Sequence, residues 1–114
     1  MLVKAYKLMA LLVSLWMLAN SPVSAAGASG SFNITRITVE GDRVYIFGTG
    51  IQNPDQCSTA NYAVILPSAA NVDRFLSVAM TAMTSQRRIS LWFVGCVASN
   101  WDASAPYAVS IFLE

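Results

Sequence analysis

The sequence contains no histidine, and this absence removes the residue that most often acts as a general base and most often binds a metal ion. Only 11% of the residues are charged, and they form no metal-ligand spacing, no glycine-rich phosphate loop and no nucleophile motif. The carboxylates offer two candidate pairs, Glu40 with Asp42 at a turn, and Asp55 with Asp102 if their loops meet. We therefore expect a protein that is not an enzyme and that uses no metal and no cofactor.

Lysine is confined to the beginning of the chain, at Lys4 and Lys7. Residues 26–114 therefore carry five of the seven basic residues, all of them arginine, and all six acidic residues, for a net charge of about −1. No basic stripe is present to neutralise phosphates, so nucleic-acid binding has no electrostatic basis.

The first 25 residues have the three-part pattern of a secretory signal peptide. Lys4 and Lys7 precede the apolar segment 8–18, and Pro22 and small residues up to Ala25 follow it. The apolar segment is shorter than the roughly 20 residues that a membrane span needs. We expect cleavage after Ala25, with Ala26 as the next choice, a secreted or periplasmic protein, and no membrane contact after cleavage; the alternative is an uncleaved N-terminal anchor.

The sequence has two cysteines, Cys57 and Cys96. Export places them in an oxidising compartment, and a mature chain of about 88 residues is near the size at which a disulfide is needed. Closing a loop of about 40 residues would stabilise the fold by roughly 4 kcal/mol in the chain-entropy model. A reactive thiol pair is the alternative, but it lacks the Cys-x-x-Cys spacing and an activating histidine. We expect a structural disulfide.

Residues 26–31 are rich in glycine and serine and are expected to form a flexible leader. Alternating apolar residues and turn signals then divide the chain into five strands and one helix. The predicted strands are 32–40, 44–50, 61–67, 89–96 and 107–114, and the predicted helix is 72–86.

The apolar residues of the first strand change face along its length. Phe32 and Ile34 share one face, whereas Ile37 and Val39 share the other. Because side chains alternate along a strand, both pairs can point inward only if the strand bends or bulges near Thr35 and Arg36. A strand that begins in one sheet and ends in another would have this pattern.

The predicted helix has Asn71 as a candidate N-cap and Asp73 in its first turn. An apolar stripe follows at helical spacing. We expect this stripe to be part of the core, or alternatively to line a channel or groove in an oligomer: Phe75, Leu76, Ala79, Met80 and Met83.

The element order is strand, strand, strand, helix, strand, strand. We expect residues 32–114 to form a single domain, mainly β with one helix, folded as a five-stranded OB-fold-like barrel. Closing the barrel would remove exposed edges from these apolar strands. An open sheet with one helix packed on it is the alternative.

The succession of "ITRITVEGDRVYIFGTG", "NYAVILP", the helix "VDRFLSVAMTAMTSQ", "ISLWFVGC" and "YAVSIFLE" resembles small secreted bacterial OB-fold proteins. Among these proteins are the B subunits of pentameric AB-type toxins, which bind glycans. The resemblance covers nearly all of the mature chain and includes the two cysteines. It implies a binding module that forms a homo-oligomer, such as a pentamer.

Two polar loops hold the candidate ligand-binding residues. Asn100, Trp101 and Asp102 lie in the last loop, where the indole could carry a sugar face or a protein partner and the polar groups could bind hydroxyls. The alternative for Trp101 is a lid folded over the end of the barrel. Gln52 and Asn53 lie in a second loop, which Cys57 would tie to the last strands; a plain connector is the alternative.

Two functions follow from these features. The first is a toxin-B-like module that recognises a glycan or protein ligand. The second is a monomeric periplasmic inhibitor or accessory protein that binds a protein partner.

Trp92 has apolar neighbours on both sides in its strand, which predicts a strand buried on both faces or an oligomer contact.

Overall fold

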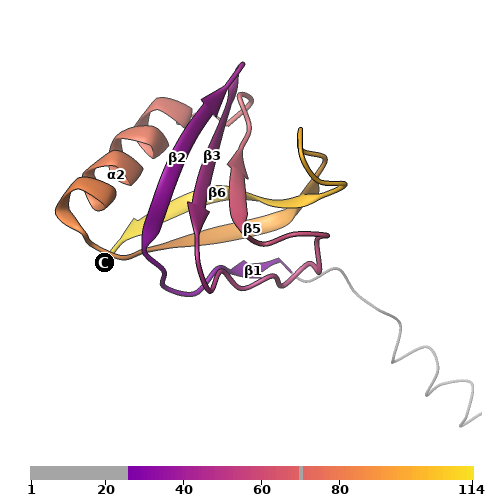
Figure 1. Ribbon diagram of the computed structural model, residues 1–114, viewed down its shortest axis with the longest axis horizontal. Coiled ribbons are helices and arrows are strands. Elements are labelled where there is room, and N and C mark those ends of the chain that lie inside the picture. The colour runs from indigo at the N-terminus through magenta and orange to yellow at the C-terminus, as the bar shows by residue number, and fades with distance from the viewer. Residues whose placement is uncertain (1–25, 70) are drawn as a thin grey trace, which may run out of the picture.

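The computed structural model of the protein describes residues 26–69 and 71–114 (Figure 1). The expected signal peptide, residues 1–25, lies outside the described residues. The elements in chain order are β1 (Gly27–Ala28), β2 (Ile34–Glu40), β3 (Arg43–Gly48), β4 (Tyr62–Ile65), α2 (Val72–Ser85), β5 (Ile89–Val97) and β6 (Ala105–Leu113).

The described residues are mainly β with one helix, as expected, but the five-stranded barrel is wrong in two respects. Six strands form one sheet in the order β1-β5-β6-β4-β3-β2, in which β4 and β6 are parallel and all other neighbours are antiparallel. This sheet is not closed into a barrel. A single isolated bridge, between Phe32 and Ile89, joins the residues before β2 to β5.

The additional strand, β1, lies in the segment that was expected to be a flexible leader. Gly27 and Ala28 pair with β5. Ser29 is fully buried, and it donates its N–H to the carbonyl of Leu91 at 2.8 Å while its Oγ accepts the Leu91 N–H at 2.7 Å. The small side chains let this segment cover the edge of β5, and a covered edge cannot pair with another chain.

The predicted bulge in the first strand is confirmed. The register of β2 against β3 shifts between Ile34 and Arg36, so that Thr35 is the extra residue. The shift turns Ile34 toward the core while Ile37, of opposite parity, packs against the same core. Gly48 lies opposite Ile34, and a Cβ at this position would overlap the ring of Phe32. Glycine is therefore required here by close approach rather than by its backbone angles.

The helix packs on one face of the sheet, beside β2 and β6 (Figure 1). It buries Phe75, Ala79 and Ala82. Met80 and Met83, expected in the core, are exposed instead, because the two alanines form the line of closest contact and the methionines lie beside it. No helix among residues 26–69 and 71–114 has the length and hydropathy needed to span a membrane.

Both predicted helix ends are close to their expected positions. Asn71 occupies the N-cap position, although its side chain makes no capping hydrogen bond, and Asp73 lies in the first turn. Gln86 ends the helix in the left-handed conformation, with φ of 56°. The chain then turns directly into β5, where Ile89 is fully buried.

Candidate functional site

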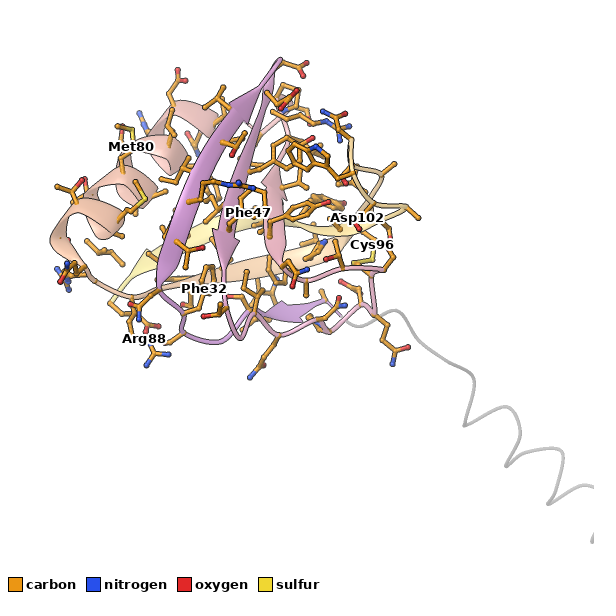
Figure 2. All side chains as sticks on the ribbon, viewed as in Figure 1. Phe32, Phe47, Met80, Arg88, Cys96 and Asp102 are labelled. Carbon is orange, nitrogen blue, oxygen red and sulfur yellow. A yellow bond between two sulfur atoms is a disulfide. The ribbon has the colours of Figure 1, made fainter. Side chains whose placement is uncertain are left out.

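The face of β3 and β4 that points away from the main core is aromatic. Val44 and Ile46 point toward the core that contains the helix, so the alternate residues Tyr45 and Phe47 point the other way. Tyr62 on β4 and Trp101 in the loop after β5 join them. We call Tyr45, Phe47, Tyr62 and Trp101 the aromatic face. Phe47 and Asp102 lie on the opposite side of β2 from Met80 of the helix (Figure 2).

Trp101 is held by the other three rings. Its centroid lies 4.7 Å from that of Tyr45 and 5.7 Å from that of Tyr62, both in edge-to-face geometry, and 6.1 Å from that of Phe47. Edge-to-face pairs at these distances are favourable beyond the area that they bury. Even so, 50% of Trp101 remains exposed. Half of the indole therefore covers buried tyrosines and half faces solvent, and a ligand-binding role for Trp101 stays a prediction.

A hydrogen-bond network fixes the loop that carries Trp101. The Tyr62 hydroxyl donates to Asp102 Oδ2 at 2.6 Å and also bonds Ser99 Oγ. Ser99 Oγ accepts the N–H groups of Trp101 and Asp102 at 3.2 and 2.9 Å. Burial of Tyr62, reinforced by its hydrogen bond to Asp102, raises its pKa to about 12. The tyrosine is therefore protonated at physiological pH and remains a donor to the carboxylate.

Polar groups flank the aromatic face. The guanidinium carbon of Arg36 lies 4.0 Å from the centroid of the Phe47 ring, a cation–π contact. Arg36 makes no ion pair with any residue that the structure describes. The Tyr62 hydroxyl donates to Oδ2 of Asp102. The other carboxylate oxygen, Oδ1, accepts no hydrogen bond within the described part of the chain. A cation against Phe47 and a carboxylate oxygen of Asp102, the residue after Trp101, are thus available at the aromatic face.

Three sets of contacts anchor the loop between β5 and β6. The predicted disulfide is confirmed, and it joins Cys57 to Cys96 with 5.6 Å between their Cα atoms. Ser58 and Ser104 exchange hydrogen bonds, with Ser58 Oγ accepting the Ser104 N–H at 2.8 Å and Ser104 Oγ accepting the Ser58 N–H at 2.9 Å. Arg43 Nη1 donates to the carbonyl of Ala98 at 2.6 Å. The loop is therefore fastened at both ends.

Comparison of the chain with protein-family models, curated proteins and solved structures finds no match. The site is therefore interpreted from its own geometry. Among the described residues, no group of three or more cysteine, aspartate and glutamate side chains could hold a metal ion. The aromatic face offers a rigid ring, a cation and a hydrogen-bond acceptor.

The structure brings together only some of the predicted binding residues. Trp101 and Asp102 lie at the aromatic face, and Asn100 is exposed between Ser99 and Trp101. Asn53 instead clamps its own loop, where its amide accepts the Cys57 N–H at 2.9 Å and donates to the Cys57 carbonyl at 2.8 Å.

Gln52 is directed to β1 rather than to the last loop. Its N–H donates to the carbonyl of Ser29 at 2.8 Å, and its side chain lies against Gly30. The loop 52–56 thus supports the N-terminal segment. A ligand-binding role for Gln52 and Asn53 stays a prediction.

Sequence reasoning missed Arg36, Tyr45, Phe47 and Tyr62. A signal was present, since "VYIF" is apolar at both parities and therefore predicts a strand covered on both faces. The sequence does not show which residue covers the second face of this strand. Trp101 is 54 positions beyond Phe47 and reaches it only through the fold of the last loop.

Proposed function

We propose that this protein is a secreted or periplasmic, non-catalytic binding module that recognises its ligand at the aromatic face. The observation that carries the proposal is the half-exposed Trp101, which is fixed on two buried tyrosines instead of being free to move. A ring that is already ordered loses little conformational entropy when a ligand covers it.

A glycan is the ligand that these groups suit best. An exposed indole provides an apolar platform for the C–H face of a sugar ring. Asp102 Oδ1 and the amide of Asn100 provide acceptors and donors for hydroxyls beside it. Arg36 adds donors on the other side of Phe47. Together they form the combination of an apolar surface and a few oriented polar groups that is typical of small-ligand sites.

The strand connectivity supports an OB-fold-like arrangement of the same site. β2, β3 and β4 form an antiparallel meander, the helix follows, and β6 then lies parallel to β4. OB-folds are partly open barrels whose face on the second and third strands, with the loop between the last two strands, binds oligosaccharides and oligonucleotides. The aromatic face occupies the corresponding strands and loop. It is built from one chain, so its ligand does not require the pentamer that the resemblance implies.

The glycan proposal is tested with a panel of immobilised neutral and acidic oligosaccharides. The probe is labelled protein purified from cells that express the full chain. We expect the protein to bind an oligosaccharide of the panel. Trp101→Ala should abolish this binding, whereas Trp92→Ala, a change on β5 outside the aromatic face, should leave it intact. Binding that survives Trp101→Ala, or no binding by the unsubstituted protein, would contradict a glycan site at the aromatic face.

A second candidate function, a monomeric inhibitor or accessory protein, is favoured by one further observation. Trp92 on β5 and Phe112 on β6 are exposed on the same sheet face, diagonal to each other across the Ser90–Phe112 and Trp92–Ser110 pairs. Exposed aromatic residues on an uncharged strand pair are typical of protein-binding surfaces. Under this proposal Trp92→Ala, and not Trp101→Ala, would prevent capture of the partner.

Export has its own test. We expect the mature protein in the periplasmic or extracellular fraction, with Ala26 at its N-terminus as determined by mass spectrometry. A full-length chain retained at the membrane would instead indicate the uncleaved anchor.

A further inference from the structure

Residues 26–114 contain two methionines, Met80 and Met83, and both lie on the helix. Met80 is 52% exposed and Met83 is 41% exposed. The other sulfur atoms of this part of the chain belong to Cys57 and Cys96, which are joined in the disulfide. The two thioethers are therefore the sulfur atoms of residues 26–114 that remain unoxidised, and solvent reaches both residues.

The two methionines are neighbours on the surface of α2. Side chains at positions i and i+3 of a helix lie about 5–6 Å apart at their Cβ atoms. The helix packs on the sheet through Phe75, Ala79 and Ala82 instead. Figure 2 shows Met80 on the opposite side of β2 from Phe47, a residue of the aromatic face. The methionine pair is thus separate from the packed core and from the candidate site.

The helix surface around the methionines is uncharged and open. Residues 75–86 include no charged side chain. Met80 borders a depression of about 380 Å³ that is also lined by Thr81, Thr84 and Ser85, and Met83 borders a second depression, of about 350 Å³. A small uncharged oxidant can therefore reach both thioethers from solvent without opening the fold.

The hydroxyl groups on this part of the helix are already used within it. Each donates to the backbone carbonyl four residues earlier, at distances of 2.6–3.0 Å: Ser77, Thr81, Thr84 and Ser85. Their donors therefore do not cover the thioether sulfur atoms, which keep their lone pairs for reaction.

Methionine reacts with two-electron oxidants such as hydrogen peroxide to give methionine sulfoxide. The sulfur attacks one peroxide oxygen with a lone pair, so that an S–O bond forms and the O–O bond breaks. The departing oxygen takes the proton from the transferred oxygen and leaves as water. Sulfur is oxidised by two electrons and the peroxide is reduced by two. Because the attack is direct, the oxidant must reach the sulfur.

We propose that Met80 and Met83 form a reversible oxidation site, at which peroxide-type oxidants convert both thioethers to sulfoxides while the fold stays intact. A sulfoxide is polar and disrupts a core when it is buried. At these positions the new oxygen faces solvent, because Ala79 and Ala82 make the close contact with the sheet. The helix surface thus changes from apolar to polar without unfolding, and sulfoxide reductases can restore it.

The test treats protein purified from cells that express the full chain with hydrogen peroxide. Trypsin cleaves after Arg74 and Arg87 and releases residues 75–87, which contain both methionines and no tryptophan. Both tryptophans outside residues 1–25 fall in residues 89–114. We expect mass spectrometry to find two added oxygen atoms in 75–87 before any appears in 89–114. The rate should be within about threefold of the rate in urea, since both methionines are already exposed.

Leucine and methionine variants provide the controls, because the two side chains have similar volumes. Met80→Leu and Met83→Leu should each take up one oxygen atom in residues 75–87, and the double variant should take up none. Leu91→Met is the buried control, since Leu91 is fully buried on β5. Its sulfur should react about tenfold more slowly than Met80 in the folded protein, because the oxidant must wait for a local opening, and equally fast in urea.

The oxidised protein should also remain folded. Changes on an exposed surface usually alter stability little, so we expect its melting temperature to fall by less than about 4 °C. The proposal would be overturned by a larger fall, by oxygen that appears first in residues 89–114, or by methionines that react as slowly as the buried control. None of these measurements involves ligand binding at the aromatic face.

Discussion

Replacing Trp101 with alanine tests how the aromatic face is held together. Trp101 and Trp92 are the two tryptophans outside residues 1–25, and their exposed fractions are 50% and 42%. Half of a tryptophan surface is about 120 Å², which corresponds to about 3 kcal/mol at 25 cal/mol per Å². Because alanine keeps part of this area, we expect burial alone to cost about 2 kcal/mol in either variant. The close exposed fractions make Trp92→Ala a matched control.

The difference between the two variants isolates the ring contacts of Trp101. Its edge-to-face pairs with Tyr45 and Tyr62, at 4.7 and 5.7 Å, should add about 1 kcal/mol beyond area. We therefore expect Trp101→Ala to lower the free energy of unfolding by about 3 kcal/mol, and Trp92→Ala by about 2 kcal/mol, in urea titrations followed by circular dichroism. A smaller loss for Trp101→Ala than for Trp92→Ala would refute the argument that the tyrosines hold the indole.

Three further predictions concern single residues. Tyr62→Phe removes a buried hydrogen bond to Asp102 and should cost about 1–2 kcal/mol in denaturant titrations at neutral pH. The pKa of Tyr62 in the folded protein is about 12, above the ordinary value of 10.0, so folding favours the protonated tyrosine. This stabilisation is complete below pH 10 and is lost as the pH rises to about 12. In melting curves measured across this range, Tyr62→Phe should abolish the loss. Cys57→Ala should lower stability by about 4 kcal/mol, since it opens a loop whose ends are 39 positions apart, and an unchanged melting temperature would contradict this expectation. Gly48→Ala should destabilise by about 1–3 kcal/mol through overlap with Phe32, and a crystal structure with the Phe32 ring unmoved would show the reasoning to be wrong.

Features that depend on neighbouring residues in the sequence were predictable. The parity change from Ile34 to Ile37 predicted a bulge because strand geometry has a strict period of two, and the structure has the extra residue at Thr35. The disulfide between Cys57 and Cys96 spans 39 positions, but it was predictable because the chain has two cysteines, each with one possible partner, and the expected export favours their oxidation. Neither inference required knowledge of how the chain folds.

Features decided by distant partners were not predictable in the same way. Ser29 carries no apolar signal, and it is buried because the edge of β5 binds its backbone and hydroxyl. Met80 has the correct helical spacing for the core, but spacing cannot show that Ala79 and Ala82 bring the helix close enough to leave it exposed. The candidate site followed the same rule, because Trp101 was predicted from its loop whereas Tyr45 appeared to be an ordinary strand residue.

The double fastening of the last loop separates the solvent-facing part of the proposed binding surface from the contacts that hold the loop in place. Cys96 and Ser104 hold the loop through contacts with residues 57 and 58, and neither is among the residues that face solvent beside the indole. Position 100, whose side chain is exposed, can therefore be randomised in a display library without loosening the scaffold, whereas Trp101 also stabilises the fold through its contacts with Tyr45 and Tyr62. Such variants should keep the disulfide and both serines. Under the proposed function, the same arrangement allows the ligand to change faster than the fold over evolutionary time.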